Sequence, residues 1–464
     1  MNQDHFVLYD HKKPIRLHAE RVSFYLQGEI IEAFSESNEV YYLFFYQYRF
    51  LTAVKATKLR RQSYIEHAFK KGMVFMAPHP FINLLLTFDH PCHIISFKQL
   101  VKKLETLYTP QENAFILTFF ESFFPRKQLF NEIKSKYYEY RRNGQMFLGY
   151  RIVRILMDFV PKHSLVKTLA NDIGFHKYAI LYNQKSEELF AKDVIFAEKT
   201  LYSQKENDQC FQKLVSHLEK QSRWIDLIAL LSDKLTVTPS TDYYRPLIKL
   251  LEQHLNENEA AYILEKLASQ LPDFLPLQQD LFTNYIRIHK MEWVLDMMNN
   301  RDFKLSDEQV HTFGDMLDHL DTKTNSLQPE KLISLLKSVM VLFPKNAEKL
   351  LNLYVISLLK THDLAYIKDW IKPIKEIHGN LQVFGKIDTM QAISDELDDM
   401  QTLGELYYEF RQMDKAIECF DWEMELKPTD PKPLQWLAKI YREKGMNQES
   451  DAYRQLCVNL QKWA

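Results

Sequence analysis

Residues 397–430 read LDDMQTLGELYYEFRQMDKAIECFDWEMELKPTD and residues 431–464 read PKPLQWLAKIYREKGMNQESDAYRQLCVNLQKWA, and these two 34-residue units decide the fold that the sequence predicts. In each unit a leucine, a small residue and an aromatic residue three positions later mark the first helix: Leu403, Gly404 and Tyr407, then Leu437, Ala438 and Tyr441. In the first unit, Ala416 and Phe420 mark a second helix that ends before Pro428. This spacing predicts a helical hairpin in each unit.

The physical reason for these residue types is close helix packing. Two antiparallel helices approach closely only where the facing side chains are small, so we expect Gly404 and Ala416 at the contact within the first hairpin. Tyr407 and Phe420 are expected to fill the wedge between neighbouring hairpins. Pro428 lacks a backbone N–H and restricts the residue before it, so it ends the second helix. One hairpin cannot bury this apolar face alone, so further hairpins are expected earlier in the chain.

The spacing resembles the tetratricopeptide (TPR) repeat, as found in bacterial proteins. The resemblance implies an α-solenoid in which the first helices line a concave groove that binds a partner protein or peptide. The groove side chains that it implies are Gln401, Glu405 and Tyr408 in the first unit and Lys432, Gln435, Lys439 and Arg442 in the second. Gln401 and Glu405 replace the lysine–asparagine pair of the family's carboxylate clamp, so a chaperone's C-terminal carboxylate is not the expected partner. The basic residues of the second unit remain suited to an acidic segment.

Similar spacing recurs earlier in the chain. Residues 242–273 carry apolar and small residues at matching offsets, and Pro329–Pro344 is expected to be the second helix of another unit. The closing prolines Pro272, Pro344 and Pro428 are 72 and 84 residues apart, about two repeat lengths each. We therefore expect degenerate helical repeats over residues 205–396.

Glycine is scarce, at 10 of 464 residues, while apolar residues make up 46% of the chain. Because tight turns between strands usually need glycine, this composition favours helices throughout. We expect an all-α protein, an α-solenoid with a less regular, aromatic-rich and mainly helical N-terminal lobe that has room for a small β element. The expected domains are residues 1–190, 205–396 and 397–464, the last consisting of two TPR repeats, 397–430 and 431–464.

Two stretches of the N-terminal lobe give different expectations. Val40–Phe50, VYYLFFYQYRF, is apolar on nearly every side of a helix and is interpreted as a core helix packed from several directions. The opening residues 1–27 alternate between apolar and polar types, which is compatible with a short β hairpin. Residues 1–190 carry 26 Lys and Arg against 18 Asp and Glu, whereas the remainder is acidic. This asymmetry suits an acidic partner or mutual attraction between two lobes.

Two segments raise the alternative of nucleic-acid binding. Ala53–Gly72 carries six basic residues that could contact phosphates, but it also has a stripe of apolar residues, so a helix with a solvated basic face is favoured. Leu165–Ile180 loosely resembles a helix-turn-helix, with His176 and Lys177 as its only base readers. A plain helix–loop–helix is favoured there, and nucleic acid is not the expected partner.

Ligand-type residues cluster in one place, at His79, Asp89, His90, Cys92 and His93. A zinc site usually takes two separated pairs of ligands, and the second pair is missing here. We interpret the segment as a proline-marked loop between helices and expect no metal site.

The leading functional hypothesis is a non-catalytic scaffold that binds a partner polypeptide in the repeat groove. No nucleophile–base arrangement, glycine-rich phosphate loop or paired-carboxylate motif is visible, so neither enzymatic activity nor a cofactor is expected. The alternative is a regulator in which a peptide or other ligand in the repeats switches an N-terminal effector lobe. Self-association stays open, and Trp463 is expected either to pack on Tyr441 or Leu460 or to mark a self-association surface.

The sequence also indicates a cellular compartment. Its four cysteines lie far apart without a CxxC pair, and neither a secretion signal nor a membrane-spanning segment is visible. These features favour a cytoplasmic protein.

Overall fold

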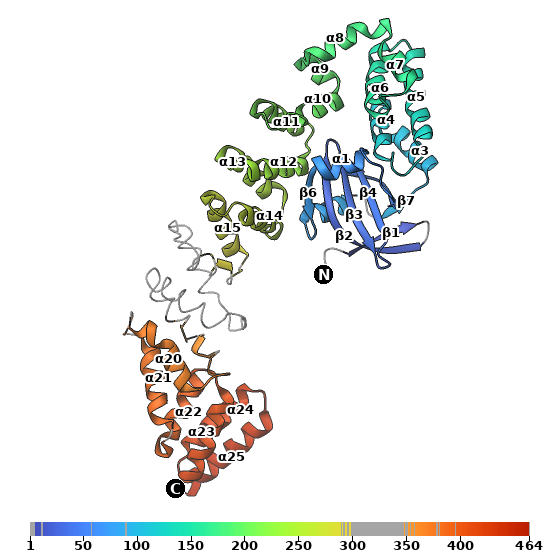
Figure 1. Cartoon of the computed structure of the whole chain (residues 1–464). Helices are drawn as coiled ribbons and strands as arrows, with labels where there is room; N and C mark the ends of the chain where they lie inside the picture. Colours follow the sequence, from blue (N-terminus) through green and yellow to red (C-terminus); the bar gives the residue numbers. More distant parts are fainter. Residues whose placement is uncertain are drawn as a thin grey trace. The chain divides into compact units, whose positions relative to one another are not determined.

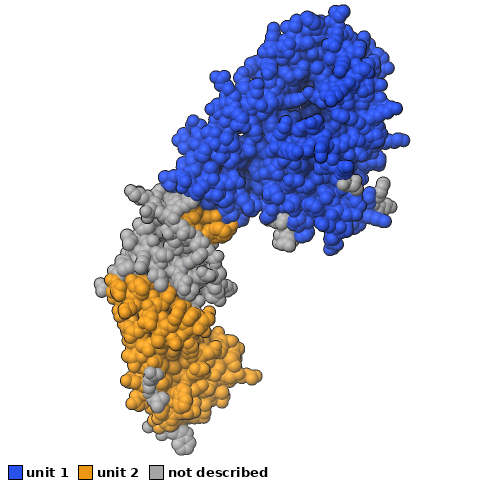
Figure 2. Space-filling view, in the orientation of Figure 1, with its two compact units in different colours: residues 1–281 blue, residues 282–464 orange. Residues whose placement is uncertain are grey.

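The computed structural model divides into two compact units, Met1–Leu281 and Phe282–Ala464, which Figure 2 colours separately. The structure describes residues 5–10, 13–56, 58–88, 91–288, 290, 293–294, 297, 348, 351–352, 354–356, 358–376, 379, 381–394 and 396–463, without the side chains of 397 and 461–463. The helix expected at Pro329–Pro344 and the contacts expected of Trp463 therefore lie outside the described part of the chain.

The N-terminal unit begins with a curved sheet, drawn in blue in Figure 1. Its strands are β1 (His5–Asp10), β2 (Lys13–Tyr25), β3 (Gly28–Ser35), β4 (Val40–Tyr46), β5 (Arg49–Ala56), β6 (Met73–Met76) and β7 (Cys92–Ile94). Their order is β5-β4-β3-β2-β1-β7, with β6 also paired to β2, and only the β1–β7 pair is parallel. The Ile95 N–H donates to Thr52 Oγ1 at 3.1 Å, which brings the two ends of the sheet together. The all-α expectation is therefore wrong for this part of the chain.

The tight turns of the sheet have left-handed backbone at residues other than glycine. Leu26, Asn38, Gln47 and Tyr48 have φ angles of 55°, 61°, 49° and 70°. Gln47 and Tyr48 alone connect β4 to β5, in a turn geometry for which Asn-Gly is the usual choice. The low glycine content misled the prediction because these residues adopt the same conformation at a cost of about 1–2 kcal/mol each.

Strand β4 occupies the stretch that was interpreted as a core helix. Six of its seven residues are buried, because both faces of the strand are covered. On the side that faces helices, the ring centroids of Phe44 and Phe120 lie 4.7 Å apart and those of Tyr42 and Phe69 lie 6.1 Å apart. A strand buried on both faces loses the alternation of apolar and polar residues, so its sequence cannot be distinguished from that of a buried helix.

Two other N-terminal expectations have different outcomes. The strands expected within residues 1–27 are confirmed by β1 and β2, which pair antiparallel with His5 opposite His18. The single helix expected at Ala53–Gly72 is wrong, because Ala53–Ala56 belongs to β5 and a helix begins only at Tyr64, after its N-cap Ser63.

The first two helices lie between the last strands of the sheet in the chain, and the remaining helices follow it. The first seven are α1 (Tyr64–Lys71), α2 (Pro80–Phe88), α3 (Phe97–Leu107), α4 (Pro110–Phe119), α5 (Arg126–Arg142), α6 (Met146–Phe159) and α7 (Ser164–Ala170). The next are α8 (His176–Gln184), α9 (Glu187–Lys192), α10 (Val194–Tyr202), α11 (Asp208–Lys220), α12 (Trp224–Val237), α13 (Thr241–His254), α14 (Glu257–Gln270) and α15 (Leu275–Arg287). The predicted hairpin at residues 242–273 corresponds to α13 and α14.

Buried polar contacts attach α10 and α12 to the sheet. The Arg223 guanidinium donates from Nη1 to Glu198 Oε2 at 2.6 Å and from Nη2 to the Leu26 carbonyl at 2.8 Å. The Tyr48 hydroxyl accepts the Ile225 and Asp226 N–H groups at 3.1 Å each, which satisfies two amides in the first turn of α12. Such contacts extend the N-terminal unit beyond residue 190, where the sequence suggested that the first lobe ends, and the compact unit runs to Leu281.

The described part of the C-terminal unit is helical. It includes α20 (Leu364–Lys375), α21 (Gln382–Ile393), α22 (Met400–Glu409), α23 (Met413–Leu426), α24 (Lys432–Glu443) and α25 (Asn447–Trp463). The last four helices form two consecutive hairpins in the chain segment that the sequence marked as two repeats (Figure 1). None of the helices in the described parts of either unit is long and apolar enough to cross a bilayer.

Candidate functional site

The first C-terminal hairpin depends on the absence of a side chain at Gly404. A Cβ atom at this position would lie 2.8 Å from Cε1 of Phe420, which is shorter than a normal van der Waals contact. The Phe420 ring on α23 therefore packs directly on the backbone of α22, and Ala416 beside it is fully buried. The close approach that the residue spacing predicted is confirmed by this contact.

In the second hairpin, a buried serine links the two helices. The Ser450 hydroxyl of α25 is buried and donates to the Ala438 carbonyl of α24 at 2.7 Å. The two hairpins are joined by Phe420, whose ring stacks on Trp436 with the centroids 5.7 Å apart and the ring planes at 5°. Trp436 thus occupies the junction between the repeats.

Three of the predicted groove residues lie in α22, and two of them, Gln401 and Glu405, form a hydrogen-bond chain that ends at Trp436. Gln401 Nε2 donates to Glu405 Oε1 at 2.7 Å. The indole N–H of Trp436 donates to the same oxygen at 3.1 Å. Sequence reasoning missed Trp436; its place three residues before Lys439, one turn away on α24, was the available signal.

Tyr408 is the third of these residues, and it contacts α24 in two ways. Its hydroxyl donates to Glu443 Oε1 at 2.6 Å. The Lys439 ammonium lies 4.5 Å from the ring centroid of Tyr408 and 4.5 Å from that of Trp436. An ammonium over two aromatic faces is held in place without losing its charge. Tyr408, Trp436 and Lys439 therefore form one aromatic–cationic platform.

The other predicted groove residues lie along α24 and face solvent. Lys432, Gln435, Lys439 and Arg442 are separated by three, four and three positions, so they form one stripe of the helix, and all four are exposed. Within the described residues, the side chains of Lys432, Gln435 and Arg442 make no hydrogen bond or ion pair. We call these four residues the α24 stripe.

No family model and no curated protein matches this chain. Among solved structures, the chain is similar to the crystal structure of MamA, with 15% identity over 44% of this chain and 89% of that one and a TM-score of 0.14. It is also similar to the structure of Naa15/Naa10 bound to HypK-THB, with 12% identity over 78% of this chain and 60% of that one and a TM-score of 0.22. These TM-scores are too low to support an argument about function, so the proposals below rest on the geometry of this chain.

Burial changes the acidity of two side chains of the first C-terminal hairpin, Cys419 on α23 and Tyr407 on α22. Burial, together with Glu418, raises the pKa of the Cys419 thiol to about 12, so the nucleophilic thiolate is scarce at neutral pH. Burial also raises the pKa of the Tyr407 phenol to about 12. Both groups serve as packing residues between the helices.

The described ligand-type residues of the N-terminal unit have structural surroundings of their own. His79 is buried against Phe75 and Phe81, and this burial lowers its pKa to about 3. Cys92 lies in β7, so this segment is not wholly a loop between helices, and Asp89 and His90 lie outside the described residues. Among the residues that the structure describes, no group of three or more His, Cys, Asp or Glu side chains could hold a metal ion.

The structure shows local contacts in the two segments considered for nucleic-acid binding. In Ala53–Gly72, Lys55 pairs with Glu39 at 2.6 Å and Lys70 pairs with Glu66 at 2.7 Å. Leu165–Ile180 runs from α7 through a short 3₁₀ turn into α8, which is the favoured helix–loop–helix.

Proposed function

We propose that this protein is a non-catalytic scaffold whose C-terminal hairpins bind an acidic, extended segment of a partner polypeptide along the α24 stripe. The observation that carries the proposal is the stripe itself: three basic side chains on one exposed helix face, of which two have no partner within the described residues. Helical-repeat proteins commonly present such a face to peptides.

The platform beside the stripe supports a specific rather than a diffuse contact. The rings of Tyr408 and Trp436 meet edge to face with their centroids 4.9 Å apart, and hydrogen bonds to Glu443 and Glu405 fix both rings. Rigid aromatic side chains provide contact area at little entropic cost. We therefore expect the partner segment to place an apolar residue on this platform and its carboxylates on the stripe.

The test is affinity capture from native lysate with the full-length chain and with the triple variant Lys432→Ala, Lys439→Ala, Arg442→Ala. Substitution is preferable to deletion of residues 397–464, because Gln412 and Lys415 donate hydrogen bonds to the carbonyls of Ile356 and Leu359. Three exposed ion pairs at about 0.5 kcal/mol each lower the affinity about 10-fold. The loss should shrink as salt is added, because screening already weakens these contacts in the wild type.

A matched control removes three other exposed cations from the same unit: Lys360→Ala, Lys372→Ala and Arg454→Ala. This variant should keep the captured partner at the wild-type level. The proposal fails if the stripe variant and the control recover the same proteins in the same amounts.

A further inference from the structure

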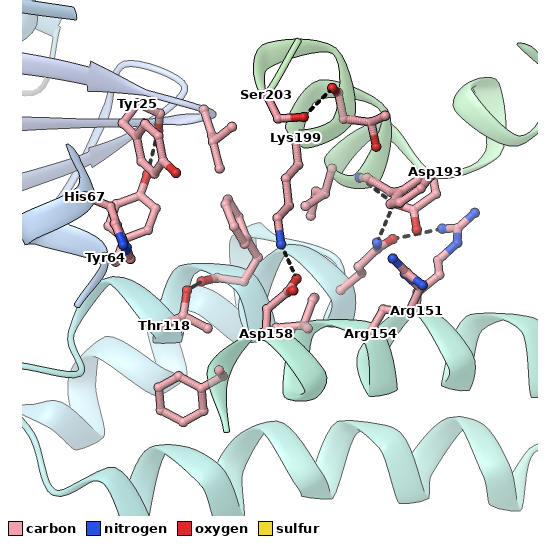
Figure 3. Close-up of a pocket in the computed structure, with 18 of the residues that line it drawn as sticks. Tyr25, Tyr64, His67, Thr118, Arg151, Arg154, Asp158, Asp193, Lys199 and Ser203 are labelled. Atoms are coloured by element: carbon pink, nitrogen blue, oxygen red, sulfur yellow. Dashed lines mark hydrogen bonds and ion pairs between the residues drawn. The ribbon is translucent and has the colours of Figure 1, made fainter. Parts of the chain in front are cut away.

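The N-terminal unit contains a cavity of about 480 Å³ that is separate from the α24 stripe (Figure 3). Its wall is formed by the β2–β3 turn and α1 on one side, by α4 and α6 on another, and by the segment from the end of α8 to α10. A cavity of this volume is in the range that holds small organic ligands.

The charges in the wall are unbalanced. Five basic residues line the cavity: Lys71, Arg151, Arg154, Lys185 and Lys199. Three acidic residues line it: Glu121, Asp158 and Asp193. The wall therefore carries an excess of two positive charges when all of these groups are ionised.

The acidic groups are already engaged within the protein. Asp193 is buried; its Oδ1 accepts Gln111 Nε2 at 2.7 Å and the Phe196 N–H at 3.1 Å. Asp158 pairs with Lys199 at 2.5 Å, and Figure 3 shows this lysine reaching across from α10. Glu121 accepts the Tyr64 N–H at 2.9 Å and lies 3.5 Å from Arg126.

The basic groups are less occupied. The Arg154 guanidinium lies over the rings of Tyr182 and Phe196, 4.6 and 4.8 Å from their centroids. Within the described residues it has no hydrogen bond and no carboxylate partner, and the same holds for the ammonium groups of Lys71 and Lys185. An arginine stays charged at any pH the protein meets, so the N–H groups of this half-buried side chain are available to an anionic acceptor.

A second donor in the same wall also lacks a partner. Arg151 Nη1 donates to Gln111 Oε1 at 3.0 Å, and Nη2 donates to the Lys192 carbonyl. The Nε atom of Arg151 is buried and has no hydrogen-bond partner in the structure. Arg151 therefore supplies this part of the wall with a second guanidinium, part of which has no hydrogen-bond partner within the described residues.

The rest of the wall is aromatic. Tyr25 and Tyr64 lie on the opposite side of the cavity from Arg154 in Figure 3, and Phe115 and Phe159 also line the cavity. A ring-shaped ligand body could pack against these side chains while its charged group meets the guanidinium.

We infer that this cavity binds a small organic phosphate, with its phosphate on Arg154 and its ring against aromatic side chains of the wall. A phosphate monoester carries nearly two negative charges at pH 7, which matches the charge excess of the wall, whereas a carboxylate carries one. Arginine is also the side chain best shaped to grip a phosphate with two parallel N–H bonds. The inference concerns binding only and does not depend on the scaffold function proposed above.

Calorimetric titration of the full-length protein tests the inference with three probes: phenyl phosphate, benzoate and inorganic phosphate. Phenyl phosphate combines the ring and the double charge, benzoate keeps the ring with one charge, and inorganic phosphate has no ring. Phenyl phosphate should show saturable binding and bind more tightly than either of the others. The inference is overturned if phenyl phosphate does not bind at millimolar concentration, or if benzoate binds as tightly.

Three variants locate the site. Arg154→Gln should weaken phenyl phosphate binding about 10-fold or more, because a charge-assisted contact is lost. Lys71→Gln keeps the packing intact, since Lys71 is exposed, and should weaken binding about 2- to 5-fold. Lys162→Gln changes an exposed lysine that does not line the cavity and should leave binding unchanged. Equal affinities in the Arg154 variant and the wild type would contradict the assignment of the phosphate to Arg154, and unchanged binding in both the Arg154 and Lys71 variants would contradict the assignment of the cavity.

Discussion

The contacts that stabilise the N-terminal unit and those that stabilise the last hairpins differ in how far apart their residues lie in the sequence. In the N-terminal unit, Arg223 bonds the carbonyl of a residue 197 positions away, and Tyr48 caps a helix that begins 176 positions later. In the last hairpins, the Gly404–Phe420 contact joins residues within one repeat, and the Tyr408–Glu443 bond spans 35 positions, one more than the 34-residue repeat.

This difference predicts different responses to mutation. A contact between distant parts of the chain forms only when the whole unit is folded, so its loss should be felt throughout the N-terminal unit. A contact within one repeat or between neighbours contributes a nearest-neighbour energy, so its loss should be felt locally. Three substitutions test this contrast.

The largest effect is expected for Arg223→Met. The guanidinium is buried between Glu198 and Asp226, and its removal leaves two carboxylates buried without their cation. We expect the free energy of unfolding of the N-terminal unit to fall by about 3–5 kcal/mol. Urea denaturation measures this, and Arg245→Met, at an exposed position of α13, should change it by less than about 0.5 kcal/mol. Equal effects of the two substitutions would show that the buried network adds nothing to stability.

A smaller and local effect is expected for Gly404→Ala. The added Cβ would meet the Phe420 ring at 2.8 Å and push α22 away from α23, at a cost of about 1–3 kcal/mol. Hydrogen exchange should speed up in residues 400–460 and stay unchanged in residues 13–56.

Gly385→Ala in α21 is the matched control for this substitution. A Cβ at Gly385 has no neighbour within 4 Å, so the control should stabilise its helix by about 0.5–1 kcal/mol. If Gly404→Ala were equally favourable, the close packing at Gly404 would not matter for the fold.

The smallest effect, and the one that depends on pH, is expected for Glu29→Gln. Burial, with Asp226 and Glu198 nearby, holds the pKa of Glu29 well above its ordinary value, while the Tyr48 N–H donates to its Oε2 at 3.2 Å. Above about pH 4.5 the unfolded state releases a proton that the folded state retains, so this group's contribution to stability falls as pH rises toward the raised pKa.

The glutamine variant cannot release this proton. The difference in free energy of unfolding between this variant and the wild type should therefore shift in favour of the variant as pH rises from about 5 to about 8. Thermal unfolding across that range measures the difference, and parallel curves for the two proteins would rule out a raised pKa at Glu29.

Like the fold, the candidate sites could be predicted from the sequence only in part. The repeat spacing was enough to select Gln401, Glu405, Tyr408 and Lys439, which the structure brings into one cluster on α22 and α24. It missed Trp436, because the position of an indole between two repeats depends on how the hairpins stack. The cavity at Arg154 had no sequence signal at all, because its wall comes from segments spread over residues 25–203.

The sequence pattern alone was sufficient to predict the C-terminal helices. A helix is stabilised by residues three and four positions apart, and two successive helices pack closely where small residues lie at their contact. The N-terminal sheet required the folded context. Leu26, Gln47 and Tyr48 take left-handed turns that isolated residues of these types disfavour, and contacts such as those of Tyr48 with α12 offset the cost. Those contacts join parts of the chain that no local pattern relates, so the sheet and the cavity beside it emerge only when the whole unit packs.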